Sequence, residues 1–240
     1  MRIFKFGGAS IKDANGVKNL VKVLNTTGID NTLLVVSAMG KTTNAFEKVI
    51  KNYFDNKKEL QSSLQDVKKF HNAILLDLFE NEKHIVFKKI ESLFNDISVF
   101  FDRNKSPDYD FIYDQVVSYG ELISTTILSE YLTDNEIPAN WLDVRDCIKT
   151  DAYYRNAKVD WTITQKQISK RVNKNTLYIT QGFIGSDSNN FTTTLGREGS
   201  DYTAAIFAYC LNAESVTIWK DVPGVLNADP RYFENSQLLN

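Results

Sequence analysis

The sequence predicts an α/β fold with a mainly parallel sheet, and three observations favour it. Strand-like segments recur along the chain, at residues 2–6, 32–36 and 176–184, with helical spacing between them. The segment 32–36, TLLVV, is a continuous apolar run of the kind found in strands buried on both faces. Strands and helices continue to alternate in the last third of the chain, which indicates successive strand–helix units.

The first forty residues predict a strand, a helix and a second strand. Residues 2–6 alternate in polarity and run into Gly7-Gly8, which predicts a tight turn after the first strand. A helix with Asp13 or Asn15 as its N-cap is expected to follow. Its apolar residues recur at helical spacing and are Val17, Leu20, Val21 and Leu24.

The region from about 44 to 132 is predicted to be mostly helical, as an insertion or helical subdomain whose charged faces are solvated. Its two histidines, His71 and His84, receive no catalytic role, because no Cys or Asp/Glu cluster stands at ligand spacing around them. The first apolar stripe of this region is formed by Leu60, Leu64, Val67, Phe70, Ile74, Leu75 and Leu78.

Strand signals return after Pro138. Residues 176–184 (TLYITQGFI) are rich in β-branched and aromatic side chains, which favour a strand. In order, we expect a strand at 139–144, a short helix within 161–172, the strand at 176–184, a polar hairpin, a helix at 202–211 and a strand at 216–219.

The composition excludes several classes of protein. The 240-residue chain has a formal net charge of −2, which argues against a general nucleic-acid binder. Cys147 and Cys210 are too few for a disulfide scaffold or a Cys-rich zinc site, and we interpret them as small packing residues. No apolar run reaches the length of a membrane span, and the N-terminus lacks a signal-peptide pattern. A cytoplasmic location without membrane or nucleic-acid partners is therefore expected.

Three polar, glycine-bearing segments follow strands, at residues 5–10, 37–44 and 196–201. In open α/β sheets, ligands bind beyond the carboxyl ends of the strands, where glycine turns and helix N-termini present N–H groups to anions. A phosphate or carboxylate ligand is therefore expected. The P-loop, protein-kinase and dinucleotide signatures are absent, since Gly40-Lys41 has Val35 where a P-loop requires glycine.

The chain carries, in this order, the strings KFGGAS, VVSAMGKTTN, SYGELIST, TQGFIGSDSNNFTTTLGREGSDYTAA and VTIWKDVPGVLNADPR. These strings resemble the aspartate kinase family, and the resemblance covers essentially the whole chain. It implies the amino-acid-kinase fold, a three-layer αβα sandwich around a mainly parallel sheet. It also implies phosphorylation of the β-carboxylate of L-aspartate by MgATP to 4-phospho-L-aspartate, the first step toward lysine, threonine, methionine and diaminopimelate.

The resemblance assigns roles to matching residues. Lys5 and Asp201 match the catalytic positions, with Lys5 reaching the transferring phosphates and Asp201 organising the reacting centre. Glu121 matches the acid that grips the α-ammonium of aspartate, and Arg197 matches the residue that pairs with a substrate carboxylate. The implied aspartate-binding residues are Ser37, Thr43, Glu121, Arg197 and Ser200. The implied ATP-binding residues are Lys5, Phe6, Gly7, Gly8, Ser10, Lys220, Asp221, Leu226 and Arg231.

The implied chemistry needs no histidine base, because the attacking carboxylate has a reference pKa of about 4 and is ionised at neutral pH. Mg²⁺ is expected to be held mainly by the ATP phosphates and water, so no protein ligand is assigned to it. L-aspartate and ATP are the expected partners, and the full-length form is expected to be a homodimer.

Three departures from the family pattern stand out. Ala9 replaces a threonine of the usual KFGGTS string, and Lys220 replaces a threonine common among relatives. Lys220 either adds charge near the nucleotide or points to solvent. The chain also stops soon after ADPR, so residues 1–240 are expected to be a C-terminally incomplete catalytic domain without regulatory ACT domains.

Two alternatives stay open. One is another member of the amino-acid-kinase family, acting on glutamate, acetylglutamate, UMP or carbamate. The other is a non-catalytic fragment of an aspartokinase that keeps the fold without turnover. Some single residues also have plain structural interpretations: Ser37 and Thr43 as caps, and Asp221 as the start of the Pro223-Gly224 turn.

Overall fold

The computed structural model describes residues 1–173, 175–220, 224, 226–230, 232–233 and 235–239. In this part of the chain, a five-stranded parallel sheet has the order β3-β4-β2-β1-β7. Its strands are β1 (Arg2–Phe6), β2 (Thr32–Val36), β3 (Asn140–Leu142), β4 (Tyr178–Gln181) and β7 (Ser215–Trp219). The predicted α/β fold with a mainly parallel sheet is confirmed.

Each central strand serves two hydrophobic cores, because successive side chains of a strand point to opposite faces of the sheet. Phe4, Leu34 and Ile179 belong to the larger core. Their sequence neighbours Ile3 and Leu33 belong to the smaller core on the other face. This arrangement explains why residues 32–36 are apolar without interruption, since all five are buried.

Helices cover both faces of the sheet and so make three layers. On one face lie α1 (Ala14–Thr27) and α6 (Tyr119–Asp134), whose apolar residues belong to the larger core. The other face is covered by α7 (Trp161–Arg171) and α8 (Gly199–Leu211). Cys147 and Cys210 are buried in the smaller core, as expected for packing residues.

The first helix shows how closely local sequence sets an element boundary. Asp13 is the N-cap of α1, and its Oδ1 accepts a hydrogen bond of 2.9 Å from the Gly16 N–H. The sequence left Asp13 and Asn15 as alternatives, and the structure selects Asp13. The helix ends at Gly28, whose φ of 76° suits glycine.

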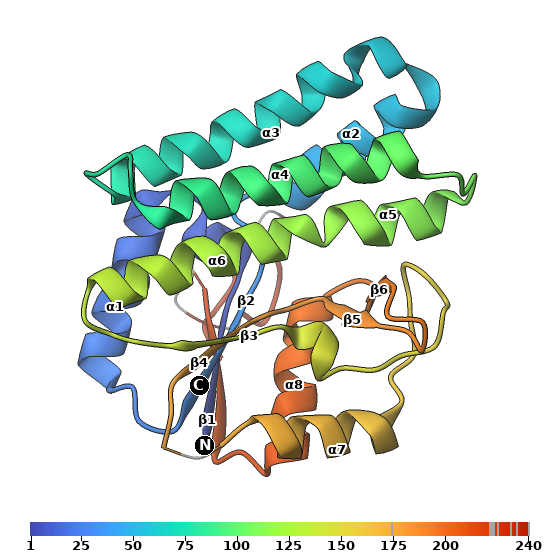
Figure 1. The fold of residues 1–240 in the computed structure, drawn as a ribbon. Helices are drawn as coiled ribbons and strands as arrows, with labels where there is room; N and C mark the ends of the chain where they lie inside the picture. The colour runs from blue at the N-terminus through green and yellow to red at the C-terminus, as the bar shows by residue number, and fades with distance from the viewer. Residues whose placement is uncertain (174, 221–223, 225, 231, 234, 240) are drawn as a thin grey trace.

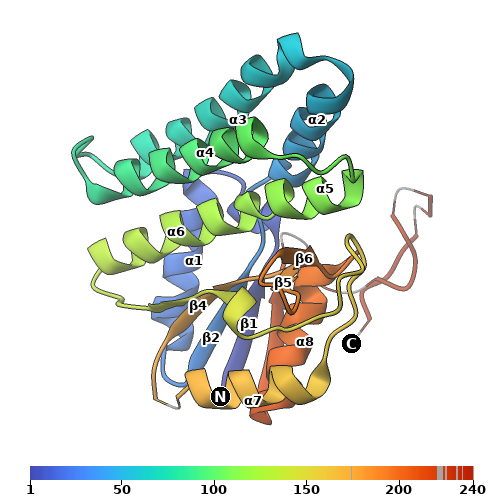
Figure 2. The same cartoon turned by 45° about the vertical axis from the view of Figure 1, so that its right-hand side comes forward.

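The predicted helical region between about 44 and 132 is confirmed as a run of helices. They are α2 (Thr42–Asp55), α3 (Lys57–Leu78), α4 (Ile85–Arg103), α5 (Tyr109–Val117) and α6 (Tyr119–Asp134). In Figures 1 and 2, β1 begins near the N label at the bottom of the view. The helices α2 to α5 lie in the upper part, beyond the carboxyl ends of the strands. They share one continuous hydrophobic core with the sheet. None of the described helices is long and apolar enough to cross a membrane.

The predicted apolar stripe of α3 is wrong at one position. Phe70 is 39 % exposed, whereas its neighbour His71 is fully buried. His71 Nδ1 lies 2.8 Å from the Val67 carbonyl oxygen, and its Nε2 lies 3.4 Å from Thr42 Oγ1. These contacts give the imidazole partners in the core, so the buried face of the helix passes through His71 instead of Phe70.

Two strands of the second half are shorter than predicted. The strand expected at 139–144 covers only Asn140–Leu142, because a short 3₁₀ turn, Val144–Asp146, follows. The strand expected at 176–184 breaks at Gly182-Phe183, where Phe183 has a φ of 70°. Ile184 instead begins β5 (Ile184–Ser186), which pairs antiparallel with β6 (Thr192–Thr194) and so forms the predicted hairpin.

The break after β4 has a steric cause. A Cβ atom added at Gly182 would lie 2.5 Å from the Cβ atom of Ser200, at the start of α8. The chain therefore needs glycine at this point to pass the helix. Helix α8 itself begins at Gly199, before the expected start at 202, so that Ser200 and Asp201 belong to its first turn.

Candidate active site

A polar cavity of about 510 Å³ lies at the carboxyl ends of β1 and β2, where the first turn of α8 meets the helical layer. This is the edge at which α/β proteins bind ligands. The structure brings together eight of the residues predicted to be functional. Those that line the cavity are Lys5, Gly8, Ser37, Thr43, Glu121, Arg197, Ser200 and Asp201.

An ion pair joins the two predicted catalytic residues. Lys5 Nζ, near the end of β1, lies 2.6 Å from Asp201 Oδ1 in the first turn of α8. Lys5 is only 7 % exposed, and Asp201 Oδ1 is buried. The lysine therefore holds its ammonium group at the cavity against Asp201, with its stem in the sheet.

The first two glycine-bearing loops touch each other through their backbones. Gly40 donates an N–H hydrogen bond of 3.0 Å to the Gly8 carbonyl oxygen. A Cβ atom added at Gly8 would lie 2.5 Å from the Ala38 carbonyl oxygen, so any larger residue would force the loops apart. Glycine at this position thus keeps the end of β1 against the end of β2, where both loops reach the cavity.

Glu121 is the most unusual group in the cavity wall. It lies in the first turn of α6 and is 2 % exposed. Its Oε1 accepts a 3.3 Å hydrogen bond from the Ala38 N–H, whereas Oε2 is buried without a partner among the described residues. Burial raises the pKa of this carboxyl to about 8, although the Ala38 hydrogen bond lowers it. The side chain is therefore largely protonated at pH 7, and a cationic group that paired with it would displace the proton.

The third glycine-bearing loop links β6 to α8. Gly196 has a φ of 79°, and Glu198, the N-cap of α8, has a φ of 55°. This turn leaves Arg197 exposed at the cavity and places Ser200, which is 9 % exposed, in the first helical turn. The N-terminus of α8 favours an anion, so the arginine and the helix dipole reinforce each other.

Ser37 and Thr43 line the cavity on the β2 side. The Ser37 carbonyl oxygen accepts a 2.7 Å hydrogen bond from Ser124 Oγ, which fixes the loop against α6. Thr43 lies one residue inside α2, and the N-cap of that helix, Lys41, makes no side-chain capping bond. Neither hydroxyl group caps a helix here, so both are available to a ligand.

The predicted nucleotide-binding residues divide into two groups. Lys5 and Gly8 line the cavity, but Phe6 is 2 % exposed and its ring stacks on Trp219 at 5.9 Å. Ser10 Oγ donates a 3.2 Å hydrogen bond to the Trp219 carbonyl oxygen. Gly7 and Ser10 are half-buried, Lys220 is exposed beyond β7, and Leu226 forms a bridge with Leu238. Asp221 and Arg231 lie outside the described residues.

Three further residues line the cavity outside the three predicted glycine-bearing segments: Tyr113, Arg155 and Phe183. Arg155 is the one with a charge, and its φ of 66° places it in the left-handed region. It lies in a loop without a recognisable motif, so only the three-dimensional structure brings it to the site. The remaining lining residues belong to the predicted segments 37–44 and 196–201 and are Ala38, Gly40, Asn44, Gly196, Glu198 and Gly199.

The parallel sheet and the polar cavity at its carboxyl edge are typical of α/β proteins that bind a small ligand at this edge. Sequence comparison makes the class specific, because the amino acid kinase family model matches residues 1–240. The chain belongs to the amino acid kinase family.

Among curated proteins, the chain is 34 % identical over 233 residues to lysine-sensitive aspartokinase 3 of Escherichia coli strain K12, covering 95 % of this chain and 51 % of that protein. It is 31 % identical to the chloroplastic bifunctional aspartokinase/homoserine dehydrogenase 2 of Arabidopsis thaliana, covering 99 % of this chain and 26 % of that protein. The chain therefore spans between a quarter and a half of the length of these relatives.

Solved structures agree with this assignment. The E. coli aspartokinase III structure in complex with aspartate and ADP, described as the R-state, superposes with a TM-score of 0.89 at 31 % identity. The match covers 100 % of this chain and 53 % of that chain. The T-state structure of the same enzyme, in complex with lysine and aspartate, gives a TM-score of 0.87.

Proposed function

We propose that this chain is the catalytic portion of an aspartate kinase, which transfers the γ-phosphoryl group of ATP to the β-carboxylate of L-aspartate. The observation that carries the proposal is the meeting of Glu121, Arg197 and the Lys5–Asp201 pair in one cavity. An amino acid with an acidic side chain has an ammonium and carboxylates to match these groups. The relative whose structure holds aspartate and ADP supports this choice of substrate and nucleotide.

In the proposed reaction, a β-carboxylate oxygen attacks the γ-phosphorus of ATP, the bond to the bridging oxygen breaks, and ADP leaves. The nucleophile is already ionised, so catalysis depends on alignment and on neutralising charge. Lys5 would supply one fixed positive charge, and Asp201 would hold the ammonium group of Lys5 in place. Glu121 would orient the substrate through its α-ammonium, and Arg197 through a carboxylate.

The nucleotide is proposed to lie on the side of the cavity formed by Lys5 and Gly8, with Phe6, Gly7, Ser10, Lys220, Asp221, Leu226 and Arg231 as further predicted contacts. Among the described residues, no group of three His, Cys, Asp or Glu side chains could hold a metal ion. We propose that Mg²⁺ is held mainly by the phosphates and water. When bound, the metal would neutralise phosphate charge.

The activity test is an ADP-release assay with MgATP and a panel of acceptors. We expect L-aspartate to stimulate release well above the rate without acceptor, and L-glutamate, N-acetylglutamate, UMP and carbamate to fail. Preferential use of another acceptor would replace the proposal by a different member of the family. Binding of aspartate and ATP without turnover would favour a non-catalytic fragment.

Four wider expectations belong to the same proposal. We propose that residues 1–240 belong to one catalytic domain, with the helices between about 44 and 132 as an insertion. We also propose a place in the pathway toward lysine, threonine and methionine, a cytoplasmic location, and a homodimer in the full-length form. Cell fractionation tests the location, and sizing of the purified full-length protein tests the homodimer.

A further inference from the structure

We propose that Arg155 is a second substrate-binding guanidinium, which contacts a carboxylate of the acidic amino acid in the cavity. The inference rests on the proposed function, because it takes an amino acid with two carboxylates as the ligand. It assigns to Arg155 a role in substrate specificity that no motif of the sequence indicates.

The first support is the position of Arg155 beside Arg197. Both residues line the same cavity, and the two backbone segments that carry them are in contact. A Cβ atom added at Gly196 would lie 3.4 Å from the Arg155 carbonyl oxygen and 2.7 Å from Asn156 Oδ1. Ala157 also donates an N–H hydrogen bond of 2.9 Å to the Thr194 carbonyl oxygen. The two arginines therefore come to the cavity from adjoining, mutually fixed segments.

The second support is the way the backbone of Arg155 is held. Its φ of 66° is unfavourable for a residue with a side chain, so the surroundings must stabilise it. Asp114 of α5, which is fully buried, accepts the Arg155 N–H at 3.0 Å. The same carboxyl accepts the N–H and the hydroxyl of Thr194, at 2.8 and 2.7 Å. Asp114 is thus a positioning residue that fixes the Arg155 loop and the strand leading to Arg197 together.

The third support is the state of the guanidinium itself. Its carbon lies 4.5 Å from the centroid of the Tyr113 ring, a residue that also lines the cavity, and 5.7 Å from that of Tyr109. One guanidinium N–H donates to Asp110 at 3.3 Å, and Glu47 lies 4.0 Å away. A guanidinium has five N–H donors, and the structure gives the others no hydrogen-bond partner among the described residues. The aromatic rings orient the charge while leaving donors for a ligand.

The two guanidinium groups of the cavity favour the amino acid over the nucleotide as the partner of Arg155. Besides the Lys5–Asp201 pair, the cavity is lined by Arg155 and Arg197, by the buried acid Glu121 and by the exposed Glu198. An acidic amino acid presents two carboxylates and one ammonium. The phosphates are proposed to lie at Lys5 and Gly8, whereas Arg155 adjoins the Arg197 loop and α5. Guanidinium is the side-chain group best suited to grip a carboxylate with two parallel hydrogen bonds.

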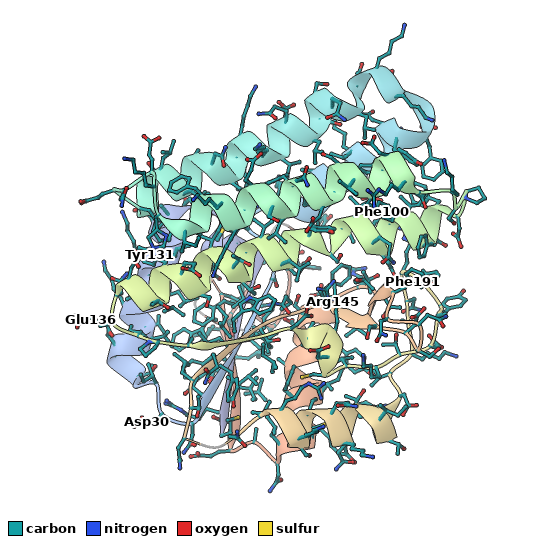
Figure 3. All side chains as sticks on the ribbon, in the orientation of Figure 1. Asp30, Phe100, Tyr131, Glu136, Arg145 and Phe191 are labelled. Atoms are coloured by element: carbon teal, nitrogen blue, oxygen red, sulfur yellow. The ribbon has the colours of Figure 1, made fainter. Side chains whose placement is uncertain are left out.

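The positive φ of Arg155 provides an unusually clean variant for the test. Arg155→Gly removes the guanidinium and places at this position the residue that tolerates the observed backbone best. The matched control is Glu136→Gly, since Glu136 is also exposed and has a φ of 58°. Figure 3 shows Glu136 at the end of α6, across the molecule from Phe191 in the β5–β6 hairpin.

The experiment is calorimetric titration of the parent protein and both variants with L-aspartate and, separately, with a non-hydrolysable ATP analogue. We expect Arg155→Gly to raise the Kd for aspartate by roughly 10- to 100-fold, the range for a lost charge-assisted hydrogen bond. Its Kd for the nucleotide analogue should change less than about twofold, and its melting temperature should not fall. The same two results are expected for the control Glu136→Gly.

Each outcome decides a separate question. Aspartate binding by Arg155→Gly within about twofold of the parent overturns the inference and leaves the proposed function intact. Weakened nucleotide binding with normal aspartate binding also overturns it, since the partner would then be a phosphate. Failure of the parent itself to bind aspartate refutes the proposed function, and the inference with it.

Discussion

Helices α5 and α6 carry two buried carboxyl groups in opposite situations, of which Glu121 lines the cavity and Asp114 does not. Asp114 on α5 accepts three hydrogen bonds, from the Arg155 N–H and from the N–H and hydroxyl of Thr194. Glu121 on α6 accepts one hydrogen bond of 3.3 Å, and its second oxygen is unpaired among the described residues. Burial raises the pKa of both carboxyl groups. For Asp114 the hydrogen bonds oppose this effect, and the resulting pKa is about 6. For Glu121 the resulting pKa is about 8.

The difference separates a structural acid from a binding acid. A buried polar group that is fully paired within the protein stabilises the segments it joins. A buried group left half-paired at a cavity costs stability in the empty protein and recovers it when a ligand supplies the missing partner. On this basis Asp114 holds the Arg155 and Thr194 segments together, whereas Glu121 has the free oxygen that the proposed binding of an ammonium group requires.

The largest effect is expected from removing the binding acid. Glu121→Ala should weaken the use of aspartate by about 2–5 kcal/mol, because it removes the partner of a buried ammonium. The KM for ATP should change little. Steady-state kinetics with each substrate varied in turn checks this, with Arg197→Ala as a parallel variant on the carboxylate side. A selective rise in the KM for ATP would reverse the assignment of the two pockets.

The next effect concerns the Lys5–Asp201 ion pair of the cavity. Lys5→Met should lower kcat by roughly 10²-fold or more, the scale for loss of one charge contact in the transition state. The fold should survive, since the far end of a lysine contributes little to packing. Kinetics together with circular dichroism measures both, and near-normal kcat in a folded variant would refute the catalytic role of Lys5.

Removing the structural acid should act on stability first. Asp114→Ala leaves two backbone N–H groups and one hydroxyl without their acceptor, so we expect a loss of about 3 kcal/mol in the free energy of unfolding. Urea denaturation of the variant and the parent measures it. If Asp114→Ala unfolds like the parent but binds aspartate poorly, the division between the two acids fails.

The smallest effect is a pH dependence caused by Glu121. Its folded pKa of about 8 lies above the reference value of 4.5, so the folded state retains a proton that the unfolded state has lost. Stability is therefore lost as the pH rises from 4.5 toward 8. Between pH 6 and pH 8 the parent should lose about 2 kcal/mol relative to Glu121→Gln, which does not titrate. Parallel unfolding curves for the two proteins in this range would contradict the raised pKa.

The sequence predicted those parts of the fold that local patterns determine. The strand β1 and the run TLLVV of β2 were found at their observed bounds, because alternation and continuous burial leave direct marks in the sequence. The break after β4 was missed, because it depends on the contact between Gly182 and Ser200. The β5–β6 hairpin separates these two residues in the sequence. The predicted stripe of α3 contained Phe70 and not His71, although the hydrogen bonds of His71 allow it to be buried.

The candidate site divides in the same way. The loops of Lys5, Ser37 and Arg197 were predicted because each follows a strand and carries glycine, and the structure places all three at one cavity. Arg155 was missed because a left-handed arginine in an irregular loop has no periodicity and no motif. The unpaired oxygen of Glu121 could not be foreseen either, since it depends on which N–H groups the fold brings near it.

We infer that Glu121 is a neutral acid in the free protein and becomes a carboxylate when the ammonium group of aspartate binds. Calorimetric titration with L-aspartate at pH 7, in two buffers with different ionisation enthalpies, measures the protons released on binding. We predict the release of close to one proton by the parent and of none by Glu121→Gln, since a pKa of about 8 keeps the free acid protonated at pH 7. Tight aspartate binding by the parent with the same heat in both buffers would contradict the claim.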